Sequence, residues 1–193
     1  MADLKNINHI LIGYDRTQEY VINREIIRYN FTDGLDLWLT AVFNGDLDKI
    51  ASGCGENTFI TIPENTGYAY GALDAINAGL RFALAGYRDI VVLTNFDGFF
   101  FNQEKYENLI DDFIASGKPF GAGKHQSHEF PMSDLMLFKR DFLKEFLPLK
   151  AEVYPPRREI DFLQNEYEGT QLGFDNVEEW VLNGLHSIGD PND

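Results

Sequence analysis

The sequence lacks most of the features that mark secreted, disulfide-bonded or membrane-spanning proteins. Cys54 is its one cysteine, which excludes an internal disulfide framework and a zinc site built on several cysteines. No apolar run approaches the roughly 18 residues that are needed to span a bilayer. The first residues also lack the basic start and the apolar stretch of a signal peptide. These absences predict a cytoplasmic protein without a membrane span.

Basic residues are scarce as well. Lysine and arginine together number 16, against 31 aspartates and glutamates, so the net charge is −15. Neither half of the chain has a basic excess, which makes nucleic acid and anionic membranes poor partners. An anionic ligand would therefore need a cation or helix N-termini to hold it. Arg157 and Arg158 are candidates to meet such a ligand, and a solvated loop is the alternative for both.

What the chain does contain is enough apolar material for a sizeable core. Apolar residues make up 44% of its 193 positions, with 16 phenylalanines, 9 tyrosines and 2 tryptophans. Short apolar runs alternate with helical patterns, which predicts an α/β fold with a mostly parallel sheet and helices on both faces. We expect strands at 9–13, 36–43, 59–62, 89–94, 120–123 and 135–138, and helices at 17–29, 70–85, 106–114 and 176–188.

The apolar spacing also predicts which face of each helix is buried. In the first helix, Val21, Ile22, Ile26 and Tyr29 form the expected stripe. In the helix after the fourth strand, the stripe is Tyr106, Leu109, Ile110, Phe113 and Ile114. The run Asp89-Ile-Val-Val-Leu-Thr94 is rich in β-branched residues and predicts a central strand that is buried on both faces.

Ligands of open parallel sheets bind at the carboxyl ends of the strands. Polar residues follow the first four predicted strands, and for each of them a turn or a helix cap is the alternative role. The residues at these ends are Tyr14, Asp15 and Arg16; then Asn44, Gly45 and Asp46; then Glu64, Asn65, Thr66 and Gly67; and finally Asn95, Phe96, Asp97 and Gly98.

The end of the fourth strand carries the most chemical information. Asp97 follows a strand that we expect to be fully buried, and an unpaired buried carboxylate is energetically costly. A hard oxygen ligand at the mouth of a cleft suits Mg²⁺ or Mn²⁺ bound to a diphosphate. The alternative is that Asp97 caps a turn with Gly98.

Three segments taken together resemble the nucleotide-sugar-dependent glycosyltransferases of the GT-A fold. They are Asn65-Thr-Gly-Tyr-Ala-Tyr-Gly71, Ile76-Asn-Ala-Gly-Leu80 and Asn95-Phe-Asp97, in the order and setting of that group. The resemblance is greatest to the inverting family 2 and its rhamnosyltransferase-like members. It covers roughly residues 8 to 138. The acidic motif departs from the family pattern at its first position, where this chain has Asn95.

The resemblance implies a single domain over 1–193, with a nucleotide-binding half at about 1–100 and an acceptor half at about 101–193. It implies a hexosyl- or deoxyhexosyltransferase that uses a UDP-, GDP- or dTDP-linked sugar, Mn²⁺ or Mg²⁺, and a glycan or other hydroxyl acceptor. Asp97 would be the metal ligand and Asn95 a contact to the metal or ribose. The remaining donor contacts would come from Tyr14, Asp15, Asn44, Asp46, Asn65 and Gly67.

The family also implies a catalytic base at the start of a late helix. Glu178-Glu179-Trp180 has the family-like position, and Glu179 lies away from the expected core stripe of that helix. Asp175 followed by Glu178 matches a capping box, so these two carboxylates have a structural alternative. The catalytic candidates are therefore Glu179, Glu178 and Asp175.

Other nucleotide-binding classes fit less well. A dinucleotide-binding domain needs Gly-x-Gly-x-x-Gly after its first strand, which is absent from this sequence. A dehalogenase-type phosphatase needs a nucleophilic aspartate where this chain has Asn95. The rival that remains is a non-catalytic nucleotide-sugar-binding domain of a larger enzyme.

Overall fold

The computed structural model describes residues 2–14, 16–45, 56–62, 68–124 and 131–148. These residues form the α/β architecture that the sequence predicts. The strands are β1 (Ile7–Gly13), β2 (Trp38–Asn44), β3 (Thr58–Ile62), β4 (Ile90–Asn95), β5 (Phe120–Lys124) and β6 (Pro131–Lys139). The helices are α1 (Thr17–Glu25), a π-helical turn η2 (Ile26–Asn30), α2 (Tyr68–Ala85), α3 (Gln103–Ala115) and α4 (Leu143–Phe146), with short 3₁₀ turns η1 (Leu4–Asn6) and η4 (Arg140–Phe142).

The described strands form one sheet in the order β3-β2-β1-β4-β6-β5. β1 pairs in parallel with both β2 and β4, and β3 pairs in parallel with β2. β6 runs antiparallel to β4 and to β5. The chain leaves β1 toward β2 and β3 on one side, and returns to β4 on the other. The carboxyl ends of β1 and β4 therefore meet at the switch point of the sheet.

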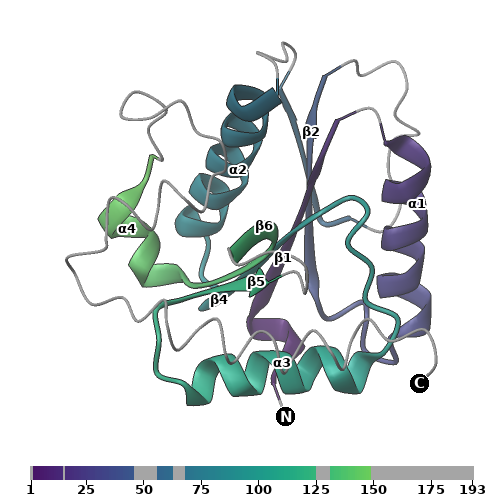
Figure 1. Ribbon diagram of the computed structural model, residues 1–193. Helices are drawn as coiled ribbons and strands as arrows, with labels where there is room; N and C mark the ends of the chain where they lie inside the picture. The colour runs from purple at the N-terminus through teal and green to yellow at the C-terminus, as the bar shows by residue number, and fades with distance from the viewer. Residues whose placement is uncertain (1, 15, 46–55, 63–67, 125–130, 149–193) are drawn as a thin grey trace.

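Helices cover both faces of this sheet (Figure 1). One core cluster joins α2 and the η4–α4 segment to the sheet, through residues such as Leu73, Ile76 and Leu143. The other cluster joins α1, η2 and α3 to the opposite face, through residues such as Tyr20, Ile27 and Leu109. The prediction of helices on both faces of a mostly parallel sheet is confirmed, and so is the burial of β4 on both faces.

The stripe predicted for the first helix is wrong in part. Ile22 and Tyr29 are 51% and 73% exposed, whereas Asn23 and Arg28 are buried. The two buried polar side chains are hydrogen-bonded, Asn23 to the carbonyls of Phe96 and Gly98, and Arg28 to the carbonyls of Gly34 and Leu37. The helix also changes to π geometry at Ile26, which rotates the following residues away from a 3.6-residue period.

The clearest helix pattern also needs one correction. In α3, Tyr106, Leu109, Ile110 and Phe113 are buried as predicted, but Ile114 is 46% exposed at the end of the helix. The helix predicted at 176–188 lies outside the described residues, so the division into a donor half and an acceptor half stays a prediction. No helix in the described part of the chain is long and apolar enough to cross a membrane.

A polar network lies inside the core beneath β1 and β4. His9 is fully buried, and its Nε2 lies 2.9 Å from the Thr94 hydroxyl. The Tyr106 hydroxyl lies 3.2 Å from the other ring nitrogen, and the two rings are stacked at 5.7 Å between centroids. Burial, together with the positive charge of Arg28, lowers the pKa of His9 from 6.5 to about 3. His9 is therefore neutral in the folded protein at pH 7.

This network predicts a loss of stability in mild acid. The unfolded chain protonates His9 near pH 6.5, whereas the folded chain does not until about pH 3. The contribution of His9 to the free energy of unfolding should therefore be constant above about pH 6.5 and fall below it, by up to about 1.4 kcal/mol per pH unit. Denaturant unfolding of wild type and His9→Gln at pH 7 and pH 5 measures this. Because the variant keeps every other histidine, equal pH slopes in the two proteins would contradict the prediction.

Candidate functional site

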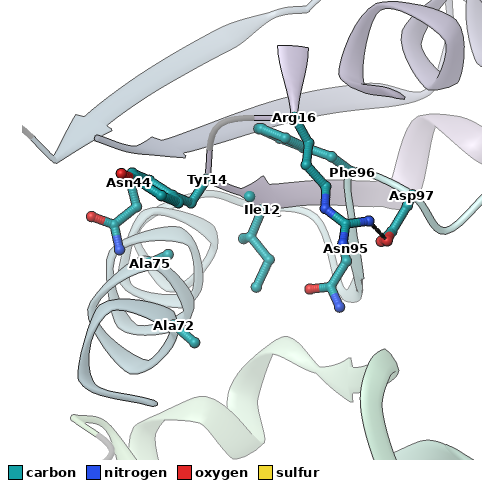
Figure 2. A pocket seen from close by; sticks show the side chains of 10 residues that line it. Ile12, Tyr14, Arg16, Asn44, Ala72, Ala75, Asn95, Phe96 and Asp97 are labelled. Carbon is teal, nitrogen blue, oxygen red and sulfur yellow. Dashed lines mark hydrogen bonds and ion pairs between the residues drawn. The ribbon is translucent and has the colours of Figure 1, made fainter. Parts of the chain in front are cut away.

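A cavity of about 610 Å³ lies at the carboxyl ends of β1, β2 and β4. This volume is within the range of small-molecule sites. Figure 2 shows the side chains that surround it, with α2 along one side. The lining is formed by Ile12, Gly13, Tyr14, Arg16, Asn44, Ala72, Ala75, Asn95, Phe96 and Asp97.

Parallel pairing of β1 with β4 positions the end of the cavity that Asn95 and Asp97 line. Ile12 pairs with Asn95, and the Phe96 amide donates to the Ile12 carbonyl at 2.8 Å. The backbone then turns, with the Gly98 amide donating to the Asn95 carbonyl at 3.0 Å. Asn95 and Asp97 are thereby presented beside the end of β1.

Glycines allow aromatic rings to pack closely against the ends of β1 and β2. A Cβ at Gly13 would lie 2.2 Å from the Phe96 ring, and a Cβ at Gly45 would lie 2.5 Å from the Tyr14 ring. Gly45 also has a φ of 144°, a conformation that L side chains rarely adopt. The Tyr14 ring, which is about half exposed, therefore lies against bare backbone at the cavity wall.

Asn44 presents an acceptor at the end of β2. Its Nδ2 donates to the Gly71 carbonyl on α2, and this partner fixes the orientation of the amide because a carbonyl can only accept. The side chain is 3% exposed, and its Oδ1 has no hydrogen-bond partner among the described residues. A buried polar atom without a partner is costly, and a hydrogen-bond donor that reached this oxygen would offset that cost. The Asn23 Oδ1 has no described partner either, although Asn23 does not line the cavity, so this feature alone does not mark a ligand site.

Arg16 and Asp97 form an ion pair at the mouth of the cavity. The Arg16 guanidinium donates to an Asp97 carboxylate oxygen, as Figure 2 shows. The two side chains are 55% and 41% exposed. An ion pair as exposed as this contributes only about 0.2–1 kcal/mol, so it can be exchanged for another partner at little cost.

Helix α1 holds the turn that carries Asp97. Asn23 donates from one amide nitrogen to the carbonyls on either side of Asp97, at 3.2 Å to Phe96 and 2.8 Å to Gly98. The Tyr20 ring packs on the Phe96 ring at 5.1 Å between centroids. The acidic turn is therefore anchored from its buried side by a neighbouring helix.

The described residues can supply part of a metal site. Among them, no group of three or more histidine, cysteine, aspartate or glutamate side chains is placed to hold a metal ion. The described cavity lining has one carboxylate, Asp97, with the Asn95 amide close in sequence. This donor set fits a Mg²⁺ or Mn²⁺ ion that takes its other oxygens from a phosphate ligand and water, but it does not form a cage by itself.

The structure brings four of the sequence-predicted site residues to one cavity: Tyr14, Asn44, Asn95 and Asp97. The other seven lie outside the described residues. They are Asp15, Asp46, Asn65, Gly67, Asp175, Glu178 and Glu179. Arg157 and Arg158 also lie outside.

Two contacts of the site do not follow from the sequence pattern. Arg16 is among the polar residues predicted after the first strand, but its pairing with Asp97 depends on the sheet order. Asn23 sits in a helix whose apolar residues suggest another buried face. A buried asparagine in a helix has no local signal, because its partners are 73 and 75 residues away.

The sheet order and the position of the cavity define a GT-A type of α/β fold, and comparison with solved structures agrees. Mannosyltransferase PcManGT from Pyrobaculum calidifontis, in complex with GDP-Man and Mn²⁺, is similar at a TM-score of 0.56 and 15% identity. The similarity covers 76% of this chain and 48% of that protein, so this chain spans about half its length. No protein-family model and no curated protein matches the sequence.

Two structures of TarS residues 1–349 from S. aureus are also similar, each at a TM-score of 0.49 and 10% identity. Each similarity covers 72% of this chain, and 48% and 46% of the respective TarS chains. One of these structures contains UDP-GlcNAc. The similarity to PcManGT confirms the GT-A fold that the sequence predicts.

The anchoring role of Asn23 predicts a clear loss of stability on truncation. Asn23→Ala removes both hydrogen bonds and leaves buried carbonyls without a donor, which should cost about 1–3 kcal/mol of unfolding free energy. Gln18→Ala is the matched control, because Gln18 is exposed on the same helix. It should change stability by less than about 0.5 kcal/mol. Equal denaturation midpoints for the two variants would show that Asn23 does not anchor the turn.

Proposed function

We propose that this protein is a metal-dependent glycosyltransferase that moves a sugar from a nucleoside-diphosphate sugar to an acceptor hydroxyl, with inversion. The supporting observation is the cavity at the switch point of a GT-A sheet, in which Tyr14, Asn44, Asn95 and Asp97 converge. The proposal extends to family 2 and its rhamnosyltransferase-like members through the sequence segments described above.

The nucleoside would lie at the ends of β1 and β2. The Tyr14 ring offers a flat apolar surface for a base, and the Asn44 Oδ1 offers an acceptor for a base N–H or a ribose hydroxyl. Asp15, Asp46, Asn65 and Gly67 belong to the same strand ends in the sequence and are proposed as further donor contacts. This arrangement accepts a UDP-, GDP- or dTDP-linked sugar.

The diphosphate would lie beside β4. Asp97, supported by Asn95, would hold a Mn²⁺ or Mg²⁺ ion, which when bound offsets the charge of the leaving nucleoside diphosphate. PcManGT, which shares the fold, was solved with GDP-Man and Mn²⁺, and this supports a divalent ion and a hexosyl donor. The alternative of a deoxyhexosyl donor rests on the sequence resemblance. Asn23 and Tyr20 would keep the Asp97 turn in place during binding.

Proton removal from the acceptor hydroxyl is assigned to Glu179. A carboxylate can act as a general base when it lies within hydrogen-bond reach of the attacking hydroxyl, here that of a glycan or another acceptor. Asp175 and Glu178 are proposed as capping residues of the same late helix.

We also propose that the protein is located in the cytoplasm.

A non-catalytic nucleotide-sugar-binding domain is the second candidate. It is favoured by Asn95 in place of the first acidic residue of the family motif. Both functions predict donor binding, but only the transferase predicts release of nucleoside diphosphate in the presence of an acceptor.

Donor binding is tested by thermal shift. UDP-, GDP- and dTDP-linked sugars are screened with and without Mn²⁺, and a ligand at about 100 times its Kd should stabilise the fold by roughly 2.7 kcal/mol. In a chain of this size, the melting temperature should then rise by roughly 5–10 °C. Asp97→Asn should lose the metal-dependent part of this shift, because it loses the charged ligand.

Asp112→Asn is the control for that variant, since Asp112 is exposed on α3 away from the cavity lining. It should retain the full shift. If Asp97→Asn binds nucleotide sugar and Mn²⁺ as tightly as wild type in calorimetry, the metal assignment is wrong.

The base is tested by turnover. Glu179→Gln should keep donor affinity and lose roughly 10²–10⁴-fold in transfer rate, the usual contribution of a positioned base. Glu178→Gln and Asp175→Asn should mainly lower the melting temperature. Sugar transfer at near wild-type rate by Glu179→Gln, with transfer abolished in one of its neighbours, would move the base to that neighbour.

A further inference from the structure

The Arg16–Asp97 pair bears directly on how the proposed site takes up a metal ion. In the described lining of the cavity, Arg16 is the one cationic side chain and Asp97 the one carboxylate. They are bonded to each other across the ends of β1 and β4. The carboxylate proposed to bind a divalent cation thus already has a cationic partner from this chain.

The charges of the groups explain why Arg16 and a divalent ion cannot both bind Asp97 favourably. Asn95 is neutral, so Arg16 and Asp97 leave the described lining without net charge. A divalent ion at Asp97 would meet the positive charge of Arg16 at the same carboxylate, and like charges at such short range repel. The metal ion and the guanidinium therefore compete for Asp97.

The displaced guanidinium has a suitable new partner in the diphosphate. Arginine presents planar N–H donors that match phosphate oxygens, and such charge-assisted bonds are among the strongest in proteins. The Arg16 side chain is 55% exposed, and an ion pair as exposed as the one it leaves is weak.

We propose that Arg16 is a counter-ion that a divalent metal displaces from Asp97, and that it then binds the diphosphate of the nucleotide. This inference rests on the proposed function. It makes the two ligands interdependent: the metal frees Arg16 for the diphosphate, and the diphosphate removes Arg16 from competition for Asp97. Each ligand should then raise the affinity of the other by the same factor.

Calorimetry on Arg16→Gln tests both halves of this exchange. For Mn²⁺ alone, the variant should bind more tightly than wild type, by up to about fivefold, because the competing cation is gone. For UDP or GDP in the presence of Mn²⁺, the variant should bind about tenfold or more weakly, because a charged donor to the phosphates is lost. These opposite directions distinguish the proposal from a simple loss of structure.

Two further variants serve as controls. Arg16→Lys keeps the positive charge and should bind Mn²⁺ alone nearly as wild type does. Arg81→Gln removes an exposed arginine from α2, outside the cavity lining, and should change neither affinity.

The outcomes separate this inference from the function itself. Mn²⁺ affinity that is unchanged or lower in Arg16→Gln, or undetectable in both proteins, overturns the counter-ion role. Equal nucleotide affinity in wild type and variant overturns the diphosphate role. If wild type binds neither nucleoside diphosphates nor their sugars with Mn²⁺, the proposed function fails, whatever the result with the metal alone.

Discussion

The site of this protein depends on the parallel pairing of β1 with β4. These two strands are separated by more than 75 residues of chain, yet Ile12 lies opposite Asn95 and accepts a hydrogen bond from Phe96. Because the chain moves outward from β1 to β2 and β3 before it returns, the two carboxyl ends open onto one cavity. Without this pairing, the polar residues after each strand would be separate turns.

Helix α1 fixes the position of the turn that carries Asp97 beside the end of β1. It begins just after Arg16, whose side chain reaches Asp97. Tyr20, about one turn further along, packs on Phe96, and Asn23, about two turns along, donates to the carbonyls of Phe96 and Gly98. Helix α1 therefore anchors the Asp97 turn from its buried side, and Arg16 contacts Asp97 from the exposed side. The Asn23 amide nitrogen is tolerated in this buried position because it donates to two backbone carbonyls.

Much of this architecture could be predicted because its signal is local. Apolar runs such as Ile90 to Thr94 and the stripe of Tyr106 to Phe113 indicate their elements through spacing alone, and the strand order of an α/β chain limits where ligands bind. The same rule predicts that Tyr14, Asn44 and Asp97 lie at one edge of the sheet, and all three line the cavity there. The errors arose where packing overrode the pattern, as at Ile22, which is exposed although it is apolar.

The sequence by itself determined the alternation of strands and helices, the buried central strand and the polar residues at its end, because these follow from hydrophobic period and turn chemistry within a few neighbouring residues. Only the tertiary structure decided that Arg16 meets Asp97, that Asn23 anchors the acidic turn, and that Asn44 donates to the Gly71 carbonyl of α2. Each of these contacts joins elements far apart in the chain, and their pairing is set by sheet order and helix packing.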